Sequence, residues 1–268
     1  MGIYKAEAIV LRSRVYGEAD RILTLFTREA GKVSAIAKGV RKPTSRLRGA
    51  VQLFSHTHLV LYTGKSLDTI TQGEAEETFC FLQEDLERLA AASGCAELVD
   101  RLTLEKQPSG KVFHLLLTAL RVLEKGDPEL LARVFEIKLL AALGYQPQLE
   151  GCVMGRHEGW RAPGPEVKEA GPVWFSIEKG GVLCADCAAH CPGALPLSPA
   201  TIGALGYFLR TRLDRAVRAK IGKVSLLELA SLLRSFFAYH GEVNVRTWDF
   251  LDDLRKNQAP SFEGMSKV

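Results

Sequence analysis

Residues 21–38 read RILTLFTREAGKVSAIAK, and the architecture of the N-terminal quarter can be worked out from their pattern. Apolar and polar residues alternate in 21–27 and again in 32–38, as expected of strands that bury one face on a core. Between them, Glu29-Ala30-Gly31-Lys32 has the composition of a hairpin turn in which Gly31 takes a positive φ. The stretch therefore predicts an antiparallel pair of strands.

One further strand is predicted before this hairpin, at residues 6–13, and two after it, at 51–62 and 67–74. Gly64-Lys65 is a second tight turn, between the last two strands. Five antiparallel strands in so short a segment must hide their edges from other chains. A small closed or partly closed barrel of the OB type protects the strand edges with the fewest residues, and an open meander is the alternative. We expect an OB-fold nucleic-acid-binding domain over residues 1–77.

Beyond residue 78 the apolar residues recur at helical spacing. The predicted helices span 79–90, 95–104, 111–125, 128–143, 199–212 and 225–239; Asp127 is the expected N-cap of the fourth, Pro128 its first turn and Gly144 its stop. The pattern lapses between 146 and 198. The sequence thus predicts an α+β multidomain chain, in which a helical domain over 78–256 is interrupted by an insert and followed by a disordered tail at 257–268.

The insert holds four of the six cysteines and the motif Cys184-Ala-Asp-Cys187. This spacing lets a tight turn present two thiolates to one tetrahedral Zn²⁺ ion, and Cys152 is the third expected ligand. A matching second turn would need a cysteine at position 155, which is Gly155. We expect a structural zinc site completed by Cys191, with His157 or His190 as alternatives; a cluster without metal is the competing interpretation.

Positive charge is concentrated near the N-terminus, where residues 1–75 hold 12 Lys and Arg against 6 Asp and Glu. A polyanion would be attracted to such a surface, so nucleic acid is the leading partner. Residues 38–49 hold five cations and no carboxylate. The expected DNA contacts are these five, Lys38, Arg41, Lys42, Arg46 and Arg48, extended by Arg12, Arg14, Arg21 and Lys32. A merely solvated loop is the alternative.

Nothing in the sequence favours an enzyme. The phosphate-binding GxxxxGK[ST] loop, a GxGxxG turn after a strand and HExxH are all absent, and no carboxylates are grouped as a nuclease would group them. His56 and His58 share a strand face and favour an ordinary half-exposed pair over a metal or phosphate site. With no apolar stretch of about 18 residues and no signal peptide, we expect a cytoplasmic protein without membrane contact.

The N-terminal motifs resemble those of the RecO family of bacterial recombination mediators and DNA-repair proteins. They are Ala8-Ile-Val-Leu11, the run RVYGEADRI at 14–22, Phe26-Thr27, Gly31 and Ala37-Lys-Gly-Val-Arg41. The resemblance continues through Gln52-Leu-Phe54 and the segment from Gly180 to Cys187, so it covers nearly the whole chain. It departs at Gly155, where zinc-bearing relatives have a cysteine.

The resemblance implies an OB-fold, a helical C-terminal domain and a zinc-ribbon-like insert. It implies binding of single- and double-stranded DNA and annealing of complementary strands. With RecR, such a protein is expected to load RecA onto DNA coated by single-strand-binding protein. No nucleotide is expected to be needed, and the protein is expected to associate with the bacterial nucleoid. In some relatives the acidic tail of single-strand-binding protein is a further partner, for which Arg121, Arg133 and Lys138 are candidate groove residues. The alternative is a generic OB-fold RNA- or single-strand-binding module; a metal-dependent nuclease is the least favoured.

Overall fold

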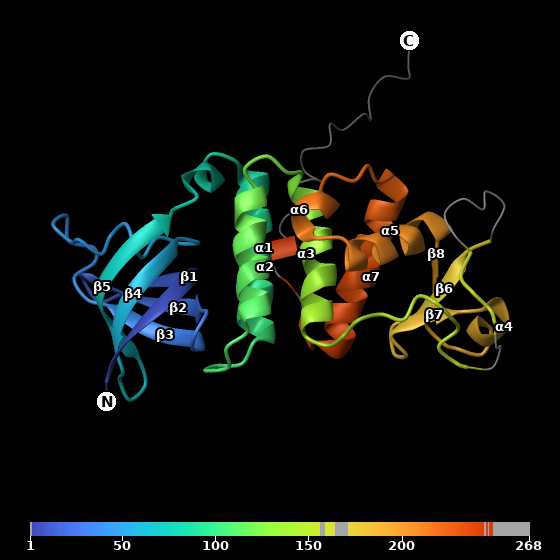
Figure 1. Ribbon diagram of the computed structural model, residues 1–268, viewed down its shortest axis with the longest axis horizontal. Coiled ribbons are helices and arrows are strands. Elements are labelled where there is room, and N and C mark those ends of the chain that lie inside the picture. Colours follow the sequence, from blue (N-terminus) through green and yellow to red (C-terminus); the bar gives the residue numbers. More distant parts are fainter. Residues whose placement is uncertain (1, 156–158, 164–170, 244, 246, 249–268) are drawn as a thin grey trace, which may run out of the picture.

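The fold is taken from a computed structural model, which describes the chain except for residues 1, 156–158, 164–170, 244, 246 and 249–268. A barrel, a group of helices and a small sheet follow one another along the long axis of the molecule (Figure 1). The predicted tail at 257–268 lies outside the described residues. No helix in the described part is both long and apolar enough to cross a membrane.

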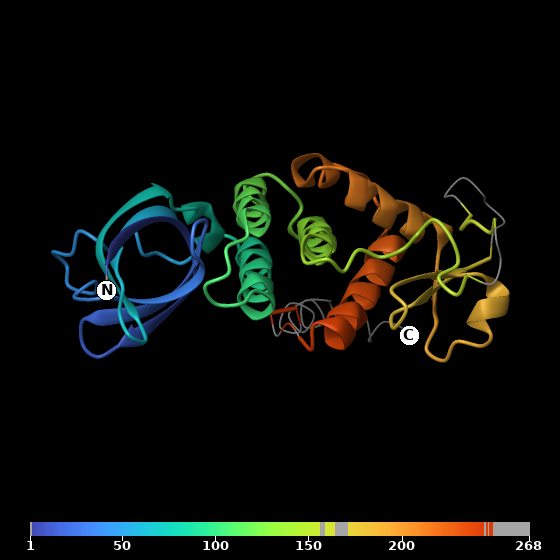
Figure 2. The same ribbon diagram turned by 60° about the horizontal axis from the view of Figure 1, so that its bottom comes forward.

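The barrel consists of β1 (Ile3–Tyr16), β2 (Asp20–Thr27), β3 (Gly31–Ala37), β4 (His56–Tyr62) and β5 (Asp68–Glu77). The strands close in the order β1-β2-β3-β5-β4. The turned view in Figure 2 shows the barrel as a closed ring. The predicted OB-type barrel is thus confirmed. The expectation that all pairs are antiparallel is wrong for β3 and β5, which run parallel. An odd number of strands cannot alternate in direction around a closed ring, so one parallel pair is required.

The predicted hairpin is present between β2 and β3. Thr27 pairs with Gly31, and Gly31 has a φ of 70°. The alternating pattern puts Val10, Leu25 and Ala35 inside the barrel. The opposite faces of these strands carry Ile9 and Phe26, which are also fully buried, because they pack against the helices that follow.

The helical part comprises η1 (Cys80–Gln83), α1 (Leu86–Leu102), α2 (Gly110–Val122), α3 (Pro128–Ala142), α5 (Pro199–Arg210), α6 (Leu213–Ala216) and α7 (Lys223–His240). The predicted cap of α3 is confirmed, since the Asp127 side chain accepts a hydrogen bond from the Leu130 backbone nitrogen at 2.9 Å. The predicted break between residues 90 and 95 is wrong: α1 runs through it. Gly94 does not end this helix but makes room for Trp248, whose ring lies 2.3 Å from where a Cβ would stand.

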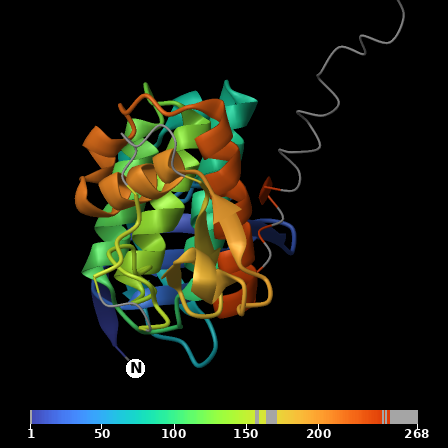
Figure 3. The same cartoon turned by 90° about the vertical axis from the view of Figure 1, so that its right-hand side faces the viewer.

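The insert contains three short strands, whose bounds the apolar pattern of the sequence did not predict. β6 (Val173–Ser176), β7 (Gly181–Leu183) and β8 (Leu195–Leu197) form a three-stranded antiparallel sheet in the order β7-β6-β8, with α4 (Ala185–Ala188) beside it. Figure 3 looks at the molecule from this end and shows the sheet in front of the helices. Strands of three or four residues are too short for a period to be read from them.

Arg133 and Glu136 form a buried ion pair on α3, with the two side chains 2.9 Å apart. The Arg133 guanidinium also lies 5.1 Å from the centre of the Trp248 ring. The expectation that Arg133 lines an exposed groove is therefore wrong: α3 is covered by its neighbours on all sides, and Arg133 is only 8% exposed. Burial raises the pKa of Glu136 from its ordinary value of 4.5 to about 7, although Arg133 opposes the shift.

This buried carboxyl gives a pH dependence of stability. Because the pKa of Glu136 is higher in the folded than in the unfolded chain, the folded state binds more protons between pH 4.5 and about 7, and stability falls as the pH rises through that window. Replacing Glu136 by Gln removes the titrating group. We expect thermal unfolding of Glu136→Gln to depend less on pH across this window than that of the wild type, whereas the exposed control Glu124→Gln follows the wild type. Equal pH dependence in all three proteins would contradict the assignment.

A second prediction concerns Gly31. A Cβ at this position would stand 2.2 Å from the Gln107 carbonyl oxygen, and φ is positive as well. Gly17 also has a positive φ, of 59°, but nothing lies within 4 Å of its missing Cβ. Gly17→Ala should cost about 1–2 kcal/mol of unfolding free energy through φ alone, and Gly31→Ala should cost clearly more in urea denaturation. Equal costs would mean that the approach of Gln107 imposes no constraint.

Candidate nucleic-acid interface and cysteine cluster

The basic loop, residues 38–49, belongs to the connection between β3 and β4. Turns of the backbone replace regular structure here, with hydrogen bonds from Lys42 N to Gly39 O and from Ser45 N to Lys42 O at 3.1 and 3.0 Å. Val40 and Ala50 at its two ends are buried in the barrel core. The loop is thus anchored by apolar side chains at both ends, while the predicted contacts Lys38, Arg41, Lys42, Arg46 and Arg48 are all exposed.

The start of the basic loop is also tied to the turn between β1 and β2. The Gly39 backbone nitrogen donates to the Asp20 carboxylate at 2.7 Å, and the Arg41 backbone nitrogen donates to the Ala19 carbonyl at 2.9 Å. The Arg41 guanidinium reaches the Glu18 carbonyl oxygen at 2.9 Å. Since a carbonyl oxygen is a neutral acceptor, this bond positions Arg41 without cancelling its charge.

None of the five cations of the basic loop forms an ion pair with a described residue. A loop that is merely solvated usually has carboxylates interspersed with its cations. Here the positive charges are left to solvent, and each can neutralise a phosphate. Arg14 is exposed on the neighbouring β1, and half-buried Arg21 on β2 donates to the Ser13 hydroxyl at 2.9 Å.

Two predicted contacts lie elsewhere, at the junction between the barrel and α1. The Asp100 carboxylate is 3.1 Å from Arg12 and 3.5 Å from Lys32. The Lys32 side chain is only 14% exposed and also donates to the Asp100 carbonyl. Lys32 therefore fastens the barrel to the helices, whereas Arg12 keeps 73% of its side chain exposed and retains a surface that a ligand can reach.

Other contacts complete this junction. The Phe26 and Phe113 rings stack with their centres 6.4 Å apart, and Arg121 on α2 donates to both oxygens of Glu77 on β5. Hydrogen bonds and the positive charge of Arg121 lower the pKa of Glu77. Arg121 is thus engaged in holding the two parts together, and half-buried Lys138 has its pKa lowered by burial. The three cations predicted to line one groove do not come together.

His56 and His58 lie in a network of carboxylates on the barrel. Buried His56 contacts Glu7 at 2.9 Å through Nε2 and Glu77 at 3.4 Å through Nδ1. Exposed His58 contacts Glu76 at 3.0 Å. His56, Glu76 and Glu77 bring ligand atoms within 4.8 Å of one another, but each ring nitrogen already faces a carboxylate oxygen. The predicted half-exposed pair is wrong for His56, which is 2% exposed, because its ring packs under Glu7 and Glu77 while His58 faces solvent.

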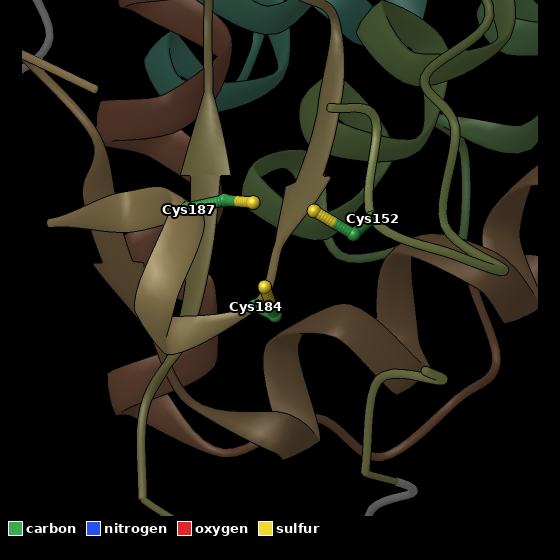
Figure 4. A group of neighbouring side chains, drawn as sticks. All are labelled: Cys152, Cys184 and Cys187. Atoms are coloured by element: carbon green, nitrogen blue, oxygen red, sulfur yellow. The ribbon is translucent and has the colours of Figure 1, made fainter. Parts of the chain in front are cut away.

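The cysteine cluster brings together the sulfurs of Cys152, Cys184 and Cys187, all within 4.8 Å of one another (Figure 4). The segment before β6 is held against β7 by hydrogen bonds from Val153 N to Val182 O at 2.9 Å and from Val182 N to Gln148 O at 3.0 Å. Gly181 permits this approach, because a Cβ there would meet the Gln148 carbonyl oxygen at 2.6 Å.

Three converging thiols form a donor set that suits a soft or borderline metal such as Zn²⁺ and does not suit Ca²⁺ or Mg²⁺. Burial, together with the hydrogen bonds that Cys187 donates to the two neighbouring thiols, raises the pKa of the Cys187 thiol to about 12. The sulfur of Cys191 lies outside this group and donates to the Ser176 hydroxyl at 3.6 Å. His190 is exposed and contacts the Asp186 carbonyl at 2.9 Å, and His157 lies outside the described residues.

Comparison with known proteins covers both parts of the chain. The family model "Recombination protein O N terminal" matches residues 1–79, and "Recombination protein O C terminal" matches residues 83–249. Proteins named DNA repair protein RecO are similar over nearly their full length. The one from Pelotomaculum thermopropionicum is 43% identical over 268 residues, covering 100% of both chains.

Two further relatives carry the same name. The protein from Desulforamulus reducens is 39% identical and covers 96% of this chain and 97% of its own, and the one from Heliobacterium modesticaldum is 40% identical over 96% and 92%. The barrel thus matches the N-terminal model of this family, and the helical part matches its C-terminal model. This chain therefore belongs to the RecO family of DNA repair proteins.

Proposed function

We propose that this chain is a DNA-binding recombination mediator in a RecF-type repair pathway. It binds single- and double-stranded DNA through the basic loop, anneals complementary strands and, with RecR, promotes loading of RecA onto DNA coated by single-strand-binding protein. The observation that carries the proposal is the set of exposed cations without ion-pair partners among the described residues, on a loop anchored in the barrel. RecR and the tail of single-strand-binding protein are proposed partners by family membership.

Annealing of this kind makes and breaks no covalent bond. Two strands repel each other through their phosphates, and a cationic surface lowers this repulsion while the bases search for register. Such a surface needs no nucleotide and no catalytic group, so the proposed role is not enzymatic. A loop that is anchored at both ends and carries exposed cations between them suits contact with a phosphate backbone.

The proposal is tested by fluorescence titration of labelled single-stranded DNA over a salt series. Arg41→Ala/Lys42→Ala/Arg46→Ala removes three phosphate partners and should flatten the slope of log K against log salt by about two units. The control variant Lys65→Ala/Lys111→Ala/Lys125→Ala removes the same charge from other exposed positions and should change the slope much less. Equal slopes for wild type and the loop variant would exclude the basic loop as the DNA-binding site.

Annealing of strands coated with single-strand-binding protein distinguishes the mediator from a generic binding module. The wild type should anneal such strands, and the loop variant should do so more slowly. A protein that binds naked single strands but leaves coated strands unannealed would be the generic OB-fold module instead.

We further propose that Cys152, Cys184 and Cys187 hold a structural Zn²⁺ ion and that Cys191, the one remaining thiol of the insert, is the fourth ligand. The ion would cross-link the segment around Cys152 to β7 and α4, in a part of the chain with a small core. Cys184→Ser should lower zinc content measured by mass spectrometry to near zero, whereas Cys80→Ser in η1 should retain it. Unchanged zinc in Cys184→Ser would refute the site, and unchanged affinity in Cys191→Ser would leave the fourth position to His157, His190 or water.

A further inference from the structure

A second cluster of cations lies where α5, α6 and α7 follow one another, far from the basic loop in sequence. We call residues 210–223 the basic corner. In these fourteen residues Asp214 is the sole carboxylate, against six exposed cations, Arg210, Arg212, Arg215, Arg218, Lys220 and Lys223. The balance of charge over the whole helical part is even, which hides this local excess.

The local backbone places three of these cations on one side of α6. Arg212, Arg215 and Arg218 recur at every third residue, and hydrogen bonds from Ala216 N to Arg212 O at 2.8 Å and from Arg218 N to Arg215 O at 3.1 Å keep the helical pitch. Leu213 and Ala216 alternate with them and are buried in the helical core. The buried residues fix the segment to the bundle, so the arginines are held together on the outer face.

The cations of the basic corner are almost unneutralised. Arg212 pairs with Asp214 at 3.2 Å, and the charge of Arg215 also acts on this carboxylate. Arg210, Arg218, Lys220 and Lys223 have no ion pair within the described part of the chain. Helix α1 shows the usual arrangement, in which Arg88 pairs with Asp85 and Arg101 with Glu97. Like charges three or four residues apart on a helix destabilise it. The repulsion within the basic corner would be relieved by a polyanion.

An exposed aromatic ring adjoins the corner. Tyr207 on α5 is 41% exposed and stands three residues before Arg210, so both project from neighbouring positions on the helix. Cations that neutralise phosphates, next to a ring on which a base can stack, are the combination found in surfaces that bind single strands. These features favour a nucleic-acid strand over an acidic peptide.

The two basic surfaces occupy different parts of the molecule. In Figures 1 and 2 the basic loop lies on the barrel, and the basic corner lies beyond α1 and α2 among the orange helices. Helix α6 packs on α2 and α3, and the barrel packs on the opposite side of α1. Because the two surfaces lie on different parts of the molecule, two strands can occupy them at the same time.

We propose that the basic corner is a second binding surface for single-stranded nucleic acid, and that one chain holds two strands, one on the basic loop and one on the corner. The inference rests on the proposed function and extends it to the mechanism of annealing. Holding both strands on one protein converts their encounter into an intramolecular search at raised effective concentration. Annealing should therefore need both surfaces, whereas tight binding of one short strand needs one.

The experiment uses the full chain and a labelled thymine oligonucleotide of about ten nucleotides, within the range of a single site. We expect two oligonucleotides per chain for the wild type and one for Arg215→Ala/Arg218→Ala/Lys220→Ala. The annealing rate of complementary strands should fall about tenfold or more in this corner variant. The variant Arg215→Lys/Arg218→Lys keeps the charge and should anneal at close to the wild-type rate, which separates charge loss from misfolding. The control variant Lys65→Ala/Lys111→Ala/Lys125→Ala should behave as the wild type.

Two oligonucleotides per corner variant, or annealing at the wild-type rate, would overturn the proposal. If the loop variant meanwhile loses DNA binding, the proposed function stands and only the corner is excluded. If neither variant affects binding, both the proposed DNA site and the corner are wrong. The corner variant could instead lose the binding of a poly-glutamate peptide that the wild type shows, while its oligonucleotide stoichiometry stays unchanged. This result would overturn the proposal in favour of an acidic protein partner.

Discussion

Closure of a five-stranded barrel is the constraint from which the proposed DNA-binding surface follows. Strands around a closed ring can all be antiparallel only if their number is even, so one pair here must be parallel, and it is the pair β3 and β5. A parallel pair cannot be joined by a hairpin. In the closed sheet β5 lies between β3 and β4. The chain therefore passes from β3 across the later position of β5 to β4, which pairs with β1, and residues 38–55 form this connection. The cations lie on this long connection, which barrel closure makes necessary.

The helices fix the other side of the barrel. Stacking of Phe26 on Phe113, the pairing of Arg12 and Lys32 with Asp100, and the bidentate contact of Arg121 with Glu77 together cover that side. The cations of the junction consequently differ from those of the basic loop. Those at the junction have carboxylate partners and serve structure, and those on the basic loop have none among the described residues and remain accessible to a ligand.

Local patterns in the sequence were sufficient for much of this architecture. The strand pair around Gly31, the cap at Asp127 and the clustering of Cys152 with Cys184 and Cys187 each depend on short-range spacing or on chemistry that residue type alone specifies. The parallel pair was missed because hairpin signals do not report how a ring closes. The predicted break between residues 90 and 95 is wrong because the residue that packs against Gly94, Trp248, lies far along the chain and leaves no local signal.

The candidate site was predicted less completely than the fold. Lys32 and Asp100 are 68 residues apart, so no local signal distinguishes Lys32 from the free cations of the basic loop. Arg133 sits on a helix that is buried all round, and its charge alone suggested exposure. The basic corner could have been found from the sequence with a short window, since six cations and one carboxylate fall within residues 210–223. Averaging charge over the whole helical part concealed it.

On the structure proposed here, phosphate backbones contact the basic loop between β3 and β4 and the basic corner between α5 and α7. Photo-cross-linking can locate both contacts: a thymine oligonucleotide with photoreactive bases is bound to the full chain and irradiated, and the cross-linked peptides are identified by mass spectrometry. We expect cross-links in peptides that contain residues 38–49 and 210–223. Cross-links confined to the cysteine insert, or to α1–α3, would contradict this expectation.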